Sequence, residues 1–157
     1  MRHPVLLLVV LLSLPSACAR DPAAASDPGS SSPSAEVIVR TDGGERSLSV
    51  RVADSEAERQ AGLMGFHDLP ADEGMAFVFD GPSTSAFWMK DTPIPLAIAF
   101  VEDGHILTIT EMTPCRTDPC PTYAAGGPYS LAVEVNAGWI GANGVRVGDE
   151  LVLLEGP

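Results

Sequence analysis

The sequence predicts a single, mainly β domain: a β-sandwich or jelly-roll-like fold, or a partly closed barrel, with one or two short helices. Two observations predict this fold class. Segments in which polar and apolar residues alternate recur along the chain, and turn signals rich in Gly, Asp and Pro separate them. Residues 36–157 have the length of one ordinary domain, and about eight short strands in such a domain favour a sandwich or barrel.

The first expected elements are a hairpin and a short helix. Residues 36–40 and 47–52 alternate polar and apolar side chains, and Asp42-Gly43-Gly44 between them is a hairpin signal. Asp54 is then the expected N-cap of a helix that continues through Gln60.

Four strands are expected in the middle of the chain. Two of them cover residues 74–79 and 85–89. Residues 95–101 form a nearly continuous apolar run, and residues 106–111 follow after a Glu-Asp-Gly turn. Because both faces of the apolar run can be buried, we expect these two strands to form a hairpin near the centre of the sheet.

The last elements follow a loop that contains two cysteines. Residues 129–135 are predicted to form a strand, and residues 150–154 the final one. Between them, Asn136 is expected to cap one turn of helix around Trp139, with Gly144 closing it.

The N-terminus has the pattern of a bacterial export signal. After a cationic start, the apolar run from Val5 to Leu12 is shorter than the roughly 20 residues that span a bilayer and matches the core of a secretory signal. Residues 14–18 resemble a lipobox, in which Pro15 replaces the usual aliphatic residue. This pattern predicts a signal peptide over residues 1–17 and acylation of Cys18. The alternative is cleavage after Ala19 and release of a soluble protein.

Residues 18–35 are almost entirely Ala, Ser, Pro, Asp and Gly. They lack apolar periodicity, so we expect a disordered linker. Together with the signal, this linker predicts an exported lipoprotein, periplasmic or on the cell surface, held to the membrane by acyl chains on Cys18.

The formal net charge of −12 excludes some partners. Nucleic-acid binding depends largely on Lys and Arg side chains that neutralise phosphates, and this chain has no basic cluster. We therefore expect no nucleic-acid partner.

An ordered series of motifs runs through the middle of the chain. The motifs are AGLMG at 61–65, EGMAFVF at 73–79, FWMKDTPIPLAIAF at 87–100, EVNAGW at 134–139 and VGD at 147–149. This succession resembles the family catalogued as domain of unknown function 192, over nearly all of residues 47–153. The resemblance implies a compact, mainly β domain of sandwich or jelly-roll character, often exported in bacteria, with no established activity.

Two positions depart from the pattern of that family. Asp91 stands where Asn is common, and Ala97 stands where Asp is common. If the family has a catalytic carboxylate after the Pro-Leu pair, this chain lacks it, and an enzymatic role is correspondingly less favoured.

The most site-like stretch contains Trp88, Lys90 and Asp91. An indole face beside a single positive charge is typical of a binding wall for an anionic or polar ligand. The alternative is that Lys90, the one lysine of the chain, lies at a strand end with its head in water. Glu134, Asn136 and Trp139 complete the hypothetical ligand-binding set.

Cys115 and Cys120 are expected to form a structural disulfide in an oxidising compartment. A redox pair usually has two intervening residues, whereas this pair has four. A zinc site would need four ligands, and the scattered methionines are more typical of core packing than of copper binding. We therefore predict neither a metal nor a cofactor.

These observations favour a non-catalytic envelope module that binds a small ligand, a glycan or a partner protein. One alternative is a hydrolase or transferase that uses Lys90 with a nearby carboxylate. Another is a purely structural role in envelope assembly.

Overall fold

The computed structural model describes residues 35–155. The predicted signal peptide (1–17), the lipid attachment site Cys18 and all but the last residue of the predicted linker lie outside the described residues. Ala35, the last residue of that linker, is the first residue of strand β1.

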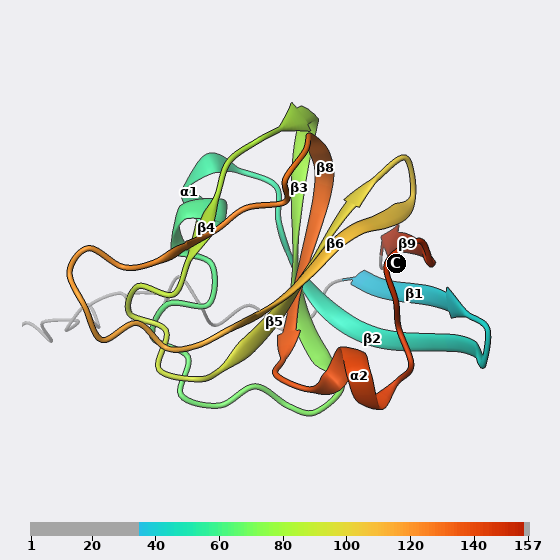
Figure 1. The fold of residues 1–157 in the computed structure, drawn as a ribbon, viewed down its shortest axis with the longest axis horizontal. Coiled ribbons are helices and arrows are strands. Elements are labelled where there is room, and N and C mark those ends of the chain that lie inside the picture. Colours follow the sequence, from blue (N-terminus) through green and yellow to red (C-terminus); the bar gives the residue numbers. More distant parts are fainter. Residues whose placement is uncertain (1–34, 156–157) are drawn as a thin grey trace, which may run out of the picture.

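The described part of the chain is mainly β, as predicted, and its seven long strands close into a barrel (Figure 1). Their order around the barrel, with bounds, is β1 (Ala35–Thr41), β2 (Gly44–Ala53), β3 (Glu73–Ser83), β8 (Tyr129–Asn136), β5 (Leu96–Glu102), β6 (His105–Met112) and β9 (Glu150–Glu155). All neighbouring pairs are antiparallel except β2 and β3. Of the predicted alternatives, the barrel is therefore correct and the sandwich is not.

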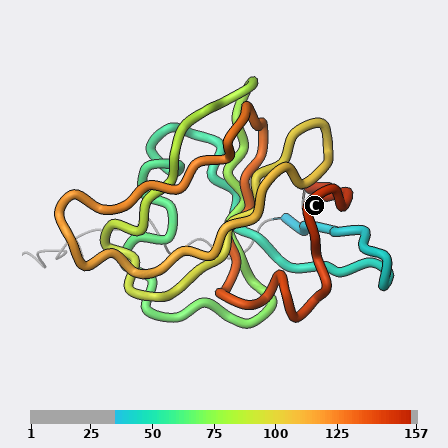
Figure 2. Tube along the Cα trace, viewed as in Figure 1, coloured from blue at the N-terminus to red at the C-terminus, as the bar shows by residue number. Residues whose placement is uncertain are grey.

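Two short strands and two short helices lie outside the barrel wall. Strand β4 (Phe87–Trp88) pairs with β7 (Thr122–Tyr123) in a separate sheet. Helix α1 (Glu56–Ala61) lies in the connection from β2 to β3, and α2 (Trp139–Ala142) follows β8. Figure 2 shows the orange excursion between β6 and β8 running along the same side of the molecule as α1 and β4. No helix within residues 35–155 is long and apolar enough to cross a membrane.

Three predicted details are wrong. The N-cap of α1 is Ser55 instead of Asp54, because Ser55 and Glu58 form a reciprocal capping box. Gly138 replaces Asn136 as the N-cap of α2. The strand expected at 85–89 is reduced to the two residues of β4, which do not join the barrel.

The central strands β3, β8 and β5 separate two hydrophobic cores. The barrel core fills the interior with small aliphatic side chains, including Val37, Val50, Ala99 and Val133. The outer core lies between the other face of these strands and the layer made by α1, β4 and the long connections. Both faces of β5 are consequently buried, as its apolar run predicted.

Aromatic and methionine side chains fill the outer core. Phe77, Phe87, Phe100 and Tyr129 form three edge-to-face pairs, with ring centroids 4.9 to 5.6 Å apart. Met89 reaches the same cluster. This packing fixes the position of β4, which bears the most exposed aromatic side chain of the described residues.

Candidate functional site

Strand β4 presents Trp88 to solvent because successive side chains of a strand point to opposite faces. Phe87 packs against Phe77 and Phe100 in the outer core, and Met89 is also buried. Trp88 between them is 48% exposed. An indole that is half exposed while its strand is anchored on both sides provides a fixed apolar platform.

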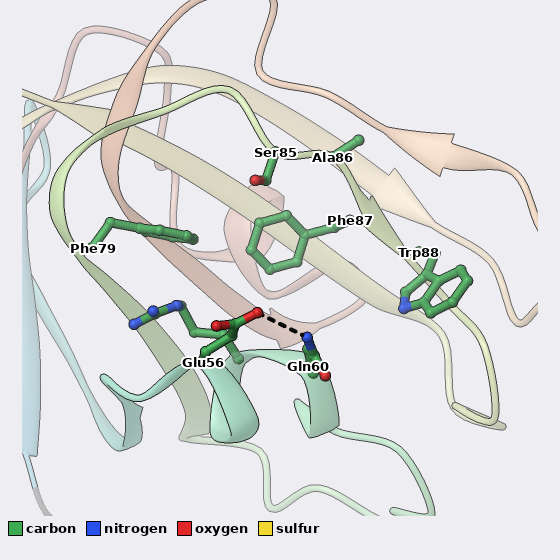
Figure 3. Close-up of a pocket in the computed structure, with 8 residues that line it drawn as sticks. Glu56, Gln60, Phe79, Ser85, Ala86, Phe87 and Trp88 are labelled. Atoms are coloured by element: carbon green, nitrogen blue, oxygen red, sulfur yellow. Dashed lines mark hydrogen bonds between the residues drawn. The ribbon is translucent and has the colours of Figure 1, made fainter.

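The first groove beside Trp88, called the helix-side groove, lies between α1 and β4. Its volume is about 320 Å³, and Glu56, Gln60, Phe79 and Phe87 contribute to its walls. Figure 3 shows Trp88 at one side of this groove, with its indole nitrogen on the edge that faces Gln60. Gln60 Nε2 donates a hydrogen bond of 3.2 Å to Glu56 Oε1, so an amide and a carboxylate are held side by side.

Helix α1 is held firmly at this groove. Its capping box also lowers the pKa of Glu58, because the Ser55 hydroxyl and amide donate hydrogen bonds to that carboxylate. Arg59 Nη1 donates to the carbonyl oxygens of Asp54 and Val78. The Arg59 guanidinium also lies 5.0 Å from the centroid of the Phe79 ring.

The second groove, called the disulfide-side groove, lies on the other side of Trp88. It has a volume of about 610 Å³, and its walls include Lys90, Asp91, Asp118 and Thr122. The loop closed by the disulfide between Cys115 and Cys120 forms its far side; the structure contains this predicted disulfide.

The turn after β4 places Lys90 and Asp91 in this groove. Lys90 Nζ lies 5.4 Å from the centroid of the Trp88 ring, a cation–π arrangement. Asp91 has a positive φ of 53°, a conformation that Asp and Asn tolerate better than most residues. Its carbonyl oxygen accepts a 2.8 Å hydrogen bond from Gly65 N–H, which ties the turn to the loop after α1.

A third, small pocket lies behind Trp88. Its volume is about 30 Å³, and Trp88, Thr92 and Glu134 are among its lining residues. Glu134 is only 4% exposed. Burial alone raises the pKa of its carboxyl group from 4.5 to about 8, because a low-dielectric environment disfavours the charged form.

Four of the six predicted ligand-binding residues therefore surround one location, and two do not. Trp88, Lys90 and Asp91 line the disulfide-side groove, and Glu134 shares the small pocket with Trp88. The other two, Asn136 and Trp139, line neither the two grooves nor the small pocket.

Asn136 and Trp139 have structural roles at the barrel, one through hydrogen bonds and one through packing. Asn136 Nδ2 donates to the carbonyl oxygens of Leu69 and Pro70, at 2.9 and 3.0 Å, which ties the connection before β3 to the end of β8. Trp139 packs against the barrel core, and its indole nitrogen is buried without a hydrogen-bond partner within residues 35–155.

Sequence reasoning missed two parts of the site. Glu56 and Gln60 were assigned only to a helix, since nothing in their spacing relates α1 to β4. The disulfide loop was recognised, but its place as a groove wall depends on the pairing of β4 with β7. Within residues 35–155 no cluster of three or more His, Cys, Asp or Glu residues could hold a metal ion.

The fold and grooves define a class: a small closed β-barrel domain with an added outer layer and an open surface around an exposed tryptophan. The chain belongs to the domain of unknown function 192 family (DUF192; uncharacterized ACR, COG1430), whose model matches residues 37–153. The predicted family is thereby confirmed.

Two solved structures share the fold. A candidate transcription regulator from Sinorhizobium meliloti 1021 is 31% identical, with a TM-score of 0.70; the match covers 75% of this chain and 92% of that one. A protein of unknown function from Novosphingobium aromaticivorans DSM 12444 is 28% identical, also with a TM-score of 0.70, over 80% of this chain and 95% of the other. No curated protein shows a significant match.

Proposed function

We propose that this domain is a non-catalytic glycan-binding module of the bacterial cell envelope. The observation that carries the proposal is the position of Trp88, half exposed at the junction of two open grooves. Sugar rings combine apolar faces with hydroxyl groups, so they bind to aromatic platforms flanked by hydrogen-bonding side chains. An elongated ligand that crosses Trp88 would reach both grooves.

The polar groups of the grooves suit such a ligand. Gln60 and Glu56 on one side, and Asp91 and Thr122 on the other, offer both hydrogen-bond donors and acceptors. Lys90 adds a positive charge next to the indole. Mixed polarity around an aromatic platform favours a neutral or weakly anionic polar ligand over an apolar one.

The envelope location rests on the predicted export signal and on Cys18. A lipid anchor followed by a disordered linker would hold the domain clear of the membrane.

Two other functions are less well supported. A catalytic Lys90 would need a carboxylate partner, and within residues 35–155 no ion pair involves Lys90. The Sinorhizobium meliloti protein is described as a candidate transcription regulator. In this chain, a net charge of −12 opposes binding to nucleic-acid phosphates.

The proposal is tested by screening the full chain against an array of soluble oligosaccharides, followed by calorimetry on the best binders. We expect the Trp88→Ala variant to lose at least about tenfold in affinity, since an aromatic anchor at the centre of a site contributes on the order of 1–3 kcal/mol.

The matched control is Val147→Ala, which truncates another exposed apolar side chain (60% exposed) that lines neither groove. Its affinity should equal that of the wild type. Absence of glycan binding at millimolar concentrations, or binding that survives the loss of Trp88, would overturn the proposal.

A further inference from the structure

Glu134 is a buried carboxyl group in an apolar setting. On β8 it lies opposite Met75 of β3 and Ile98 of β5 in the sheet register, and both neighbours belong to the outer core. Burial is the cause of its raised pKa. At neutral pH the side chain is therefore a neutral acid, which can donate one hydrogen bond and accept another.

The pocket that Glu134 lines, called the Glu134 pocket, has walls from several elements of the outer layer. Leu63, Met64 and Phe77 provide apolar wall, and Arg59, Gln60 and Thr92 add polar groups, so the lining is mixed. Trp88 links the pocket to both grooves. A volume of about 30 Å³ is two to three times the roughly 10–15 Å³ that one water molecule needs. It therefore has space for a side group of two or three non-hydrogen atoms.

Within residues 35–155, no salt bridge involves the carboxyl group of Glu134. Arg59 of α1 is the one charged residue besides Glu134 among those that line it. Its guanidinium donates instead to the carbonyl oxygens of Asp54 and Val78. The other titratable groups on the elements packed against the pocket are not among its lining residues. They are Glu56 and Glu58 of α1, His67 and Asp68 of the following connection, Glu73 and Asp80 of β3, Lys90 and Asp91 after β4, Glu102 of β5 and Tyr129 of β8.

We propose that the Glu134 pocket is a subsite for the acetyl part of the acetamido group of an N-acetylated sugar, with Glu134 donating a hydrogen bond to the acetamido carbonyl oxygen. This inference rests on the proposed glycan function and names its substrate class. The acetyl part is neutral and has three non-hydrogen atoms, and it combines a hydrogen-bond acceptor with a methyl group that suits the apolar side chains of Leu63, Met64 and Phe77. A ligand that displaces water from this pocket without pairing the carboxyl group would leave a buried polar group unsatisfied, which is costly. A ligand that pairs with the carboxyl group is therefore selected.

Charged ligand groups of either sign suit the Glu134 pocket less well. A carboxylate or phosphate would place a second acid beside the buried carboxyl group of Glu134 in the same small pocket. An ammonium group would require Glu134 to ionise, and its affinity would increase as the pH rises. A neutral acceptor has the reverse dependence, because the ionised carboxylate has no proton to donate.

The experiment is calorimetry on the full chain with two probes of the same linkage, triacetylchitotriose and cellotriose. Cellotriose has a hydroxyl where the first sugar has an acetamido group. We expect the wild type to prefer the acetylated sugar by at least about tenfold, as expected when a site is built to pair a buried hydrogen-bonding group. We expect this preference to fall by about tenfold or more from about pH 6.5 to about pH 9.5. The reason is that, above the pKa of about 8, each further pH unit lowers the protonated fraction of the carboxyl group about tenfold.

The diagnostic variant is Glu134→Gln, which keeps the shape and an N–H donor but cannot ionise. It should bind the acetylated sugar at both pH values with little change between them. A pH dependence that persists in this variant would assign the titration to another group and overturn the inference.

A second measurement does not depend on that variant. The carboxyl carbon of Glu134 in isotopically labelled wild-type protein reports its pKa by NMR, and binding of the acetylated sugar should raise this pKa further. A lowered pKa would indicate a cationic ligand and would overturn the inference.

The two proposals fail in different ways. Equal binding of both sugars that is lost in Trp88→Ala leaves the glycan function standing and removes the acetamido subsite. Failure of the wild type to bind either sugar, or any member of the oligosaccharide array, removes both.

Discussion

The two cores of this molecule differ in composition and in what they can do. The barrel core consists of small aliphatic side chains enclosed by seven strands, and the space left inside it is about 10 Å³. The outer core combines aromatic and methionine side chains with Leu, Ile and Ala. Short elements and connections cover it (Figure 1). The Glu134 pocket opens in this outer layer, and both grooves border Trp88 on its surface.

The difference follows from how each core is closed. Strand pairing satisfies the backbone all around the barrel, so small side chains suffice to fill its interior. The outer layer has only β4, β7 and α1 as regular elements, so large aromatic side chains must fill the irregular space beneath the connections. Irregular packing leaves pockets, and pockets can hold a ligand. We therefore expect the barrel to provide stability and the outer layer to provide binding.

The largest expected effect is a pH dependence that arises in the outer layer. Glu134 has a pKa of about 8 in the folded protein and an ordinary value of 4.5 when exposed. Unfolding between these two pH values releases a proton, so the free energy of unfolding falls as the pH rises from 4.5 to 8. Each pH unit in that window costs up to about 1.4 kcal/mol, which amounts to several kcal/mol in total.

This dependence is measured by urea denaturation of the wild type and of Glu134→Gln across that window. The difference between the two proteins isolates Glu134 from every other titrating group. If both proteins lose stability with pH in parallel, Glu134 is not a buried acid and the contrast between the cores weakens.

A smaller effect is expected at the wall shared by the two cores. A Cβ atom at Gly74 would lie 2.5 Å from the backbone oxygen of Glu134 and 3.1 Å from Leu48 Cδ1. Gly74→Ala should therefore cost roughly 1–3 kcal/mol, because β3 and β8 must move apart. Thermal unfolding measures this loss.

Gly81→Ala is the matched control on the same strand, where an added Cβ meets nothing within 4 Å. Its effect should be neutral or slightly stabilising. Equal destabilisation by both substitutions would mean that close packing of the shared wall does not determine the result.

The smallest effect is expected at the cap of α1. Ser55→Ala removes the hydroxyl that accepts from Glu58 N–H and should cost about 1 kcal/mol. Ser49→Ala, at an exposed position of β2, is the control for a serine without a capping role. If Ser55→Ala leaves the melting temperature unchanged, α1 contributes little to holding the outer layer closed.

Several elements could be read from the sequence because their signals are local. The hairpin of β1 and β2 follows from alternation and a glycine turn, and the β5–β6 hairpin from an apolar run next to a turn. The disulfide follows from the spacing of an isolated cysteine pair. The prominence of Trp88, Lys90 and Asp91 was likewise visible in one short motif.

Other features depend on contacts between distant segments. The two-residue strand β7 has no signal of its own and exists because Phe87 and Trp88 pair with Tyr123 and Thr122. Asn136 resembles a helix cap in sequence, but the carbonyl groups of Leu69 and Pro70 lie within its reach in the fold.

By itself, the sequence determined that this chain forms a mainly β domain of the DUF192 family with a disulfide, since periodicity, turns and ordered motifs are properties of neighbouring residues. Only the tertiary structure decided that the sheet closes, that Glu134 is buried and that Trp88 lies between two grooves. Closure depends on β9 meeting β1, and burial depends on which segments cover β8. Neither relation is encoded locally, because both arise when segments far apart in the chain pack together.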